Sequence, residues 1–167
     1  MWNKKVRPLV THADAYNFCL DRLALRDHSS LELRQKLQER QCPEDLQDQV
    51  LEKLRAHHFV DDGRCAGYVL DAWRRKKFYG RQYLKMMLQK RMIPQEKASL
   101  VLEEVSEQEE TERAEDFARS VLAKLHRKYP GKDNWRKGKA ALARMLGSRG
   151  FGSGAVAVTL PLWDEDE

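Results

Sequence analysis

An internal repeat constrains the fold of this chain more than any other feature. Apolar residues at helical spacing, a basic residue and a proline recur together at an interval of 51 residues. The aligned pairs are Leu33 and Leu84, Leu37 and Leu88, Arg40 and Arg91, Cys42-Pro43 and Ile93-Pro94, Val50-Leu51 and Val101-Leu102, and Leu54 and Val105. A further shift of 58 residues aligns Leu84 with Leu142, Leu88 with Leu146, Arg91 with Arg149 and Ile93 with Phe151. The pattern predicts an all-α chain of three tandem three-helix, helix-turn-helix-like repeats in an elongated or curved arrangement.

The repeat register divides the chain into five segments. We expect an N-terminal extension at 1–12, repeats at 13–58, 59–105 and 106–162, and an acidic tail at 163–167. The third repeat should end in a degenerate, short or frayed helix, because Val156 and Val158 are weak helix formers and Pro161 cannot sit inside a continuing helix. We expect the tail from Asp164 onward to lack regular structure, and residues 105–113 to form a hinge or a long helix.

Helix starts can be located from their capping residues. The first helix should span about 14–26, and Ser29 with Glu32 forms the Ser-x-x-Glu capping box of the second. Asp61 and Asp62 are expected to accept the free backbone N–H groups that open the first helix of the second repeat. The third helix of the second repeat should begin at a proline, as its counterpart in the first repeat does.

Composition favours a protein of the cytoplasm. Charged residues make up 34% of the 167 residues, and no apolar run approaches the roughly 18 residues that span a bilayer. The cysteines Cys19, Cys42 and Cys65 are odd in number and lack C-x-x-C spacing. They are best interpreted as small buried residues in a reducing compartment.

Two basic blocks flank an acidic one. Eight cations and no acid lie between Ala72 and Arg91, namely Arg74, Arg75, Lys76, Lys77, Arg81, Lys85, Lys90 and Arg91. The second block comprises Arg119, Lys124, Arg127, Lys128, Lys132, Arg136, Lys137 and Lys139. Solvated helix faces are the simpler explanation, but this density favours a polyanionic partner. Trp73 has the spacing of a core residue, whereas Tyr79, in the turn before Gly80, is the better candidate for an exposed contact.

The sequence offers little support for catalysis. The glycines between 147 and 154 lack the Lys-Ser/Thr of a phosphate-binding loop. Asp61 and Asp62 have no third ligand at metal-binding spacing, so helix capping explains them with fewer assumptions. We therefore expect no enzyme activity, no cofactor and no metal.

Several motifs resemble the RecX family of bacterial regulators of RecA recombinase. They are Arg26-Asp27-His28-Ser29 with Glu32-Leu33, then Phe59-x-Asp61-Asp62-x-Arg64-x-Ala66 with Tyr79-Gly80, and Arg149-Gly150-Phe151. The match covers 15–151 and is strongest over 15–105. The chain departs from the family pattern at Cys65, where Phe is usual, and in its last helix.

The resemblance implies a non-enzymatic monomer that binds RecA and RecA–DNA filaments. It implies suppression of ATP hydrolysis, strand exchange and coprotease activity in DNA repair and the SOS response, with some contact to single- or double-stranded DNA. The candidate contact residues are Arg64, Arg74, Arg75, Lys76, Lys77, Tyr79, Arg81, Lys85, Arg136, Lys137 and Lys139. Arg64 could instead pair with the acids beside it. Two alternatives stay open: a helical regulator that binds DNA directly and without RecA through the Gly80 turn, and a scaffold that binds neither.

Overall fold

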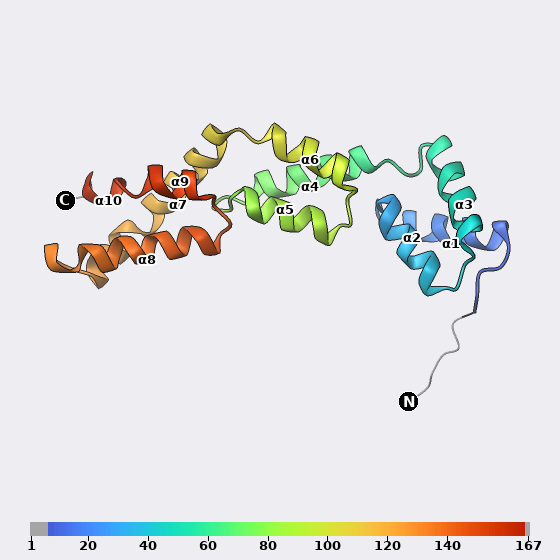
Figure 1. The fold of residues 1–167 in the computed structure, drawn as a ribbon, viewed down its shortest axis with the longest axis horizontal. Helices are drawn as coiled ribbons and strands as arrows, with labels where there is room; N and C mark the ends of the chain where they lie inside the picture. Colours follow the sequence, from blue (N-terminus) through green and yellow to red (C-terminus); the bar gives the residue numbers. More distant parts are fainter. Residues whose placement is uncertain (1–6, 166–167) are drawn as a thin grey trace, which may run out of the picture. The chain divides into compact units, whose positions relative to one another are not determined.

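The protein is all-helical throughout residues 7–165, the part that this computed structural model describes (Figure 1). The helices are α1 (His12–Leu23), α2 (Ser30–Glu39), α3 (Glu44–Ala56), α4 (Asp62–Arg75), α5 (Arg81–Lys90), α6 (Gln95–Glu104), α7 (Glu107–Lys128), the 3₁₀ turn η1 (Lys132–Asn134), α8 (Trp135–Ser148), α9 (Ser153–Thr159) and α10 (Leu162–Glu165). The predicted all-α class is confirmed. The first six residues of the expected extension, and Asp166 and Glu167 of the expected tail, lie outside the described residues. None of the described helices is long and apolar enough to cross a membrane.

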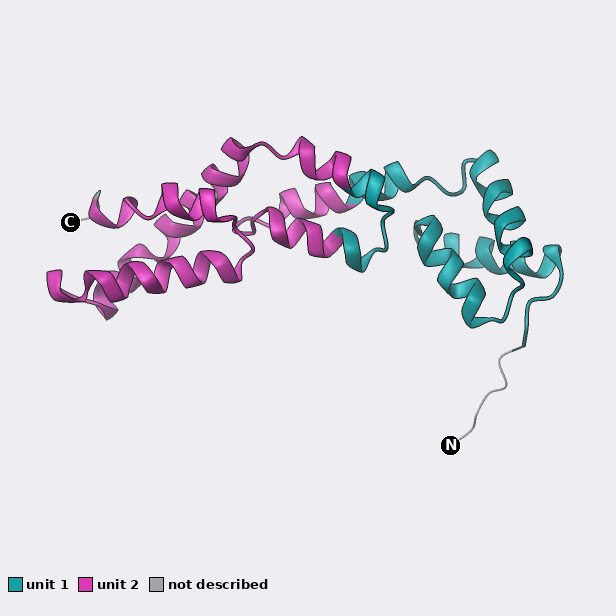
Figure 2. Ribbon diagram, viewed as in Figure 1, with its two compact units in different colours: residues 1–68, 88–98 teal, residues 69–87, 99–167 magenta. Residues whose placement is uncertain are grey.

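The chain forms two compact units, coloured separately in Figure 2. Unit 1 comprises residues 1–68 and 88–98, and unit 2 comprises residues 69–87 and 99–167. The boundary passes through α4, α5 and α6, so the helices of the second repeat contribute residues to both units.

The core of unit 1 lies among α1, α2 and α3. Its buried residues are Leu9, Ala15, Cys19, Leu33, Leu37, Cys42, Val50, Leu51, Leu54 and Val60. Leu9 precedes the first helix, and its backbone N–H donates to the carbonyl of Arg40 at 3.0 Å. Sequence reasoning placed Leu9 in an extension, but burial of its apolar side chain fastens this segment to the core.

The core of unit 2 is built by α7, α8, α9 and α10. Its buried residues are Ala114, Phe117, Ala118, Leu122, Leu125, Ala141, Leu142, Leu146, Phe151, Ala155 and Trp163. Trp163 belongs to this core, and Asp164 lies within α10. The expectation that the tail lacks regular structure is therefore wrong for Asp164, because the burial of the neighbouring indole orders this turn of helix.

The end of the second helix has the same geometry in all three repeats. A residue with positive φ follows it each time: Gln41 (54°), Met92 (46°) and Gly150 (80°). The next backbone N–H bonds to a carbonyl five residues earlier, in the pairs Cys42–Leu37 (3.0 Å), Ile93–Leu88 (3.1 Å) and Phe151–Leu146 (3.3 Å). This is the hydrogen bond that closes a helix at a left-handed residue, and it falls at the positions that the sequence repeat aligned.

Hydroxyl side chains set the starts of three helices. The predicted Ser29–Glu32 capping box is confirmed at α2. Helix α1 begins two residues before the expected start, because the Thr11 hydroxyl accepts the N–H of Asp14 at 3.1 Å. Helix α7 begins at 107, because Ser106 accepts the N–H of Glu109 at 3.0 Å. At 22 residues, α7 is the long-helix alternative considered for 105–113. The seven-residue α9 confirms the short last helix.

Candidate binding surface and the loops that support it

The C-terminal end of α4 is held by Arg113 of α7. Its guanidinium donates to the carbonyls of Trp73 (3.0 Å) and Tyr79 (3.2 Å) and to that of Lys76. It also lies 4.0 Å from the centre of the Trp73 ring. A cation at this end complements the helix dipole, although burial lowers the pKa of Arg113. Trp73 is fully buried, as its spacing predicted.

The Gly80 turn is packed against the loop between α8 and α9. The N–H of Gly80 donates to the carbonyl of Arg149, and that of Gln82 to the carbonyl of Gly150, both at 2.9 Å. A Cβ on Gly80 would lie 2.4 Å from the Gly150 carbonyl oxygen and 2.4 Å from Cα of Phe151. Glycine is therefore required for close backbone approach. This close packing explains why glycine occurs at positions 80 and 150, so no phosphate-binding loop is needed to account for these residues.

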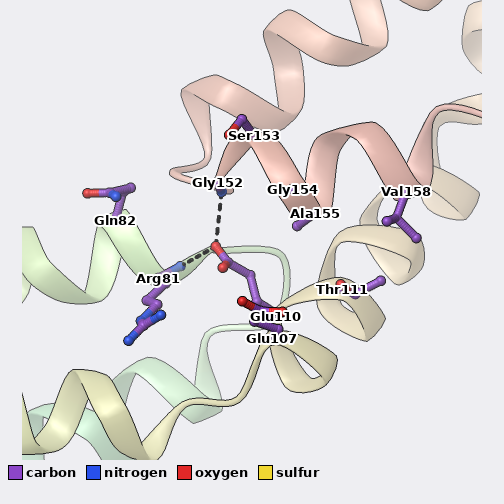
Figure 3. A pocket seen from close by; sticks show the side chains of 10 residues that line it. All are labelled: Arg81, Gln82, Glu107, Glu110, Thr111, Gly152, Ser153, Gly154, Ala155 and Val158. Atoms are coloured by element: carbon purple, nitrogen blue, oxygen red, sulfur yellow. Dashed lines mark hydrogen bonds between the residues drawn. The ribbon is translucent and has the colours of Figure 1, made fainter.

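Glu110 of α7 accepts hydrogen bonds at the starts of two other helices of unit 2, α5 and α9 (Figure 3). Its carboxylate accepts the N–H of Arg81, where α5 begins, and the N–H of Gly152, before α9, each at 3.0 Å. The carboxylate borders a hollow of about 350 Å³ that Arg81, Glu107 and Ser153 also line. Sequence reasoning missed Glu110, because its partners lie 29 and 42 residues away.

Unit 1 contains the corresponding contact. Asp62 accepts the N–H of Ser30 at 2.7 Å and its hydroxyl at 2.6 Å. Ser30 and Arg81 are equivalent in the sequence repeat, so an acid from the following repeat holds the start of the second helix in both cases. We expected Asp62 to cap its own helix, and the structure corrects this. Asp61 alone does so, by accepting the N–H of Arg64 at 2.9 Å.

Two arginines pair with the buried carboxylate of Glu32 in unit 1. Arg26 pairs with Glu32 at 2.9 Å, and Nε of Arg91 lies 3.4 Å from the same carboxylate. Burial raises the pKa of Glu32, but the Arg26 and Ser29 hydrogen bonds and the charge of Arg91 outweigh it and leave the pKa below its usual value. The Ser29 hydroxyl also donates to the Arg91 carbonyl at 3.0 Å. Arg91 is thus engaged within the protein.

Two of the candidate contact residues in the second repeat are paired internally. Arg74 binds Glu104 at 3.1 Å and Glu109 at 3.2 Å, and the Glu109 hydrogen bond raises the pKa of Arg74. Arg64 binds Asp27 at 3.1 Å. This is an acid partner for Arg64, as the alternative interpretation expected, but it comes from the first repeat.

Four other candidates in the second repeat are exposed. Arg75, Lys76, Lys77 and Lys85 make no ion pair with any acid in the described part of the chain. These four side chains, called the α4–α5 cations below, remain available to an external anion. Arg81 is half-buried, with its N–H on Glu110.

Tyr79 is less exposed than its turn position suggested. Its ring lies against that of Tyr83 in a tilted arrangement with centroids 4.2 Å apart, and the Arg149 guanidinium lies 4.9 Å from its centre. Lys76 approaches the same ring at 5.9 Å. Aromatic and cationic neighbours thus surround the half-buried ring.

In α8, Arg136 and Lys137 are exposed, whereas Lys139 binds Asp164 of α10 at 2.8 Å. The three cysteines are free and buried, as predicted. Burial raises the pKa of Cys19 to about 12 and that of Cys65 to about 11.

Comparison with known proteins identifies the family. Residues 15–54 match the model of the first three-helix domain of RecX. The regulatory protein RecX of Cronobacter sakazakii is 32% identical over 152 residues, which cover 82% of this chain and 87% of that protein. The chain belongs to the RecX family. The regulatory protein RecX of Mycobacterium ulcerans is also 32% identical, over 80% of this chain and 75% of its own.

Solved structures share the fold. The crystal structure of RecX from Lactobacillus salivarius superposes with a TM-score of 0.77 at 19% identity and covers 92% of this chain and 97% of that one. A second crystal structure of regulatory protein RecX gives a TM-score of 0.73 at 22% identity and covers 93% and 73%. The relatives carry the name of regulatory proteins, and membership of the RecX family supports a regulatory role for this chain.

Proposed function

We propose that this protein is a non-enzymatic modulator of RecA recombinase in the cytoplasm. It binds RecA and RecA–DNA filaments and suppresses ATP hydrolysis, strand exchange and coprotease activity, and so limits recombination, DNA repair and the SOS response. Family membership supports the regulatory role, and the α4–α5 cations are the observation that supports a polyanionic partner.

The α4–α5 cations provide the contact in this proposal. Their charges meet carboxylates of the filament or DNA phosphates, both of which cationic side chains bind well. Arg74 acts differently. Its guanidinium already joins α4 to Glu104 and Glu109, so its contribution is to hold the basic segment in place. Glu110 and Arg113 support the same segment from α7.

The decisive assay is DNA-dependent ATP hydrolysis by RecA, with this protein added at well below one molecule per RecA protomer. Strong inhibition at such ratios supports a filament modulator, because one-for-one sequestration of DNA or protomers cannot produce it. Unchanged hydrolysis at equal amounts contradicts the proposal.

A charge-reversal pair tests the surface. In R75E/K77E, two exposed attractions of about 0.2–1 kcal/mol each become repulsions of similar size, so inhibition should require about tenfold more protein. The control K53E/R55E makes the same charge change in the last turn of α3. Equal loss in both variants would show that net charge, and not this surface, controls binding.

A direct DNA-binding regulator is the second candidate, because the α4–α5 cations would equally bind phosphates. It predicts DNA affinity without RecA that falls steeply with salt. The Gly80 turn is not free to enter a groove in the manner of a helix-turn-helix motif, since it packs on Arg149 and Gly150. Under this candidate, the ATP hydrolysis assay gives no inhibition while a gel-shift assay detects DNA binding.

A further inference from the structure

The residue before the second helix of a repeat contacts the repeat that follows. Ser29, which precedes α2, donates its hydroxyl to the carbonyl of Arg91 in the second repeat at 3.0 Å. Gly80 holds the equivalent position before α5, and its N–H donates to the carbonyl of Arg149 in the third repeat at 2.9 Å. Arg91 and Arg149 are themselves equivalent in the sequence repeat. We call the position of Ser29 and Gly80 the first docking position.

An acid makes a second contact one residue further along. Asp62 accepts the N–H of Ser30 at 2.7 Å, and Glu110 accepts that of Arg81 at 3.0 Å. Each acid lies four residues before a buried alanine in the first helix of its own repeat, so the two acids are equivalent. We call the position of Ser30 and Arg81 the second docking position. Both positions bind the repeat that follows.

Helix α10 occupies both docking positions of the third repeat, which fall on Gly138 and Lys139. Trp163 anchors α10 at the first: its side chain is 1% exposed, and a Cβ on Gly138 would lie 2.2 Å from its Cη2 atom. Asp164 binds Nζ of Lys139, at the second, at 2.8 Å. Helix α8 starts four residues earlier in the repeat register than α5. The N–H of Lys139 therefore bonds within its helix, and the acid meets the side chain instead.

The segment before α1 fills the complementary position on the first repeat. The carbonyl of Arg40 lies at the loop position that Arg91 and Arg149 hold in the later repeats, and it accepts the N–H of Leu9 at 3.0 Å. The Leu9 side chain is buried. Leu9 thus supplies the hydrogen bond that the later repeats receive from the repeat before them. Residues 7–9 and α10 are caps of the kind that close repeat proteins.

The two capped faces carry complementary charges. A hollow of about 270 Å³ beside the N-terminal cap is lined by Arg7, Asp14, Asp21 and Arg40, among others. Arg7 belongs to the cap, and the Arg40 guanidinium donates to a carbonyl of the cap. The two acids are exposed and make no ion pair with a cation in residues 7–165. The face under α10 carries Lys139 and, one turn earlier on the same side, the exposed Arg136.

We propose that these two faces bind each other between copies of this chain, and that the two caps keep the copies apart. With the caps displaced, the loop after α2 of one copy replaces the Trp163 indole on Gly138 of the next. Lys139 then exchanges Asp164 for the acids of α1. The interface is heterologous, because each copy contributes a different face. This interaction does not depend on any action on RecA.

Complementation between two variants tests both faces. L9P removes the N–H and the buried side chain that hold the N-terminal cap, and W163A/D164N releases the C-terminal cap. Each variant should stay monomeric alone and with wild type, whereas their equimolar mixture should sediment at about twice the mass of the single chain, 19.6 kDa. The triple variant L9P/W163A/D164N should form longer oligomers, because heterologous contacts can propagate.

Circular dichroism first establishes that each variant is folded. If W163A/D164N is not, D164K replaces it, because this change keeps Trp163 and repels Lys139. A mixture that stays monomeric overturns the proposal. Self-association of either variant alone, as strong as in the mixture, also overturns it, because exposed apolar surface would then explain the binding.

A matched pair of charge variants tests the acids of α1. Adding D14N/D21N to L9P should raise the dissociation constant of the mixture about 3–10-fold. The control E44Q/E52Q removes two exposed acids from α3 and should leave the constant unchanged. Equal weakening by both changes would show that net charge, and not the α1 face, controls the interaction, and would overturn the proposal.

Discussion

Two glycines of α8, Gly138 and Gly147, have different surroundings, and this difference gives a test of how Trp163 packs on the helix. A Cβ on Gly147 meets nothing within 4 Å. Alanine is favoured over glycine inside a helix, so G147A should raise the free energy of unfolding by about 0.5–1 kcal/mol. A Cβ on Gly138 would lie 2.2 Å from Cη2 and 2.4 Å from Cζ2 of Trp163. G138A gains the same helical preference but must displace a buried ring.

The size of the penalty follows from the burial of Trp163. Forcing an extra methyl group into a packed site costs about 1–3 kcal/mol. Releasing the indole altogether costs about as much as W163A, roughly 3–5 kcal/mol. We therefore expect G138A to be about 1–3 kcal/mol less stable than G147A. In a W163A background the clash is absent, and G138A should become stabilising by about 0.5–1 kcal/mol.

Urea unfolding followed by circular dichroism measures all four variants. The midpoints should change while the slopes stay constant, since the same surface is exposed on unfolding. If G138A is as stable as G147A, the indole does not pack on Gly138. The reasoning about the anchor, and about how Asp164 reaches Lys139, then fails.

Three further predictions follow from the buried polar groups. E110Q keeps the shape of the side chain but loses its charge, so it should weaken both N–H contacts and lower stability by about 1–3 kcal/mol in urea unfolding; stability equal to wild type would contradict the double contact. Burial and the charge of Arg26 lower the pKa of His28 below 6.5, while the hydrogen bonds and charges around Glu32 keep its pKa below 4.5 despite burial. In both cases the unfolded chain binds a proton at a higher pH than the folded chain does, so stability should decline below pH 6.5 and again below pH 4.5. A free energy of unfolding that stays constant from pH 7 to pH 4 would exclude this. With thiol pKa values raised by burial, Cys19 and Cys65 should react with a disulfide reagent at pH 8 only after unfolding, and rapid native reaction would show that they are accessible.

Much of the fold could be predicted because its signals are local. Apolar spacing located the helices, and a capping box needs only Ser29 and Glu32, three residues apart. The repeat register places Gln41, Met92 and Gly150 at equivalent positions, and all three have a positive φ in the structure. The candidate surface could be predicted as a group, because a run of eight cations without an acid can be read directly from the sequence. The sequence could not predict which of these cations make ion pairs within the protein. The acids that pair with Arg74, for example, lie 30 and 35 residues away.

The sequence by itself therefore determined the helices, their caps, the repeat and the density of positive charge, since each depends on residues within a few positions of one another. Only the tertiary structure decided which polar groups are engaged. Glu110 accepts hydrogen bonds at the starts of two other helices, and Asp62 accepts from Ser30 and does not cap its own helix. Trp163, which was expected to lie in the tail, is part of the core. These contacts join residues far apart along the chain, and a carboxylate accepts hydrogen bonds from whichever donors folding brings within reach.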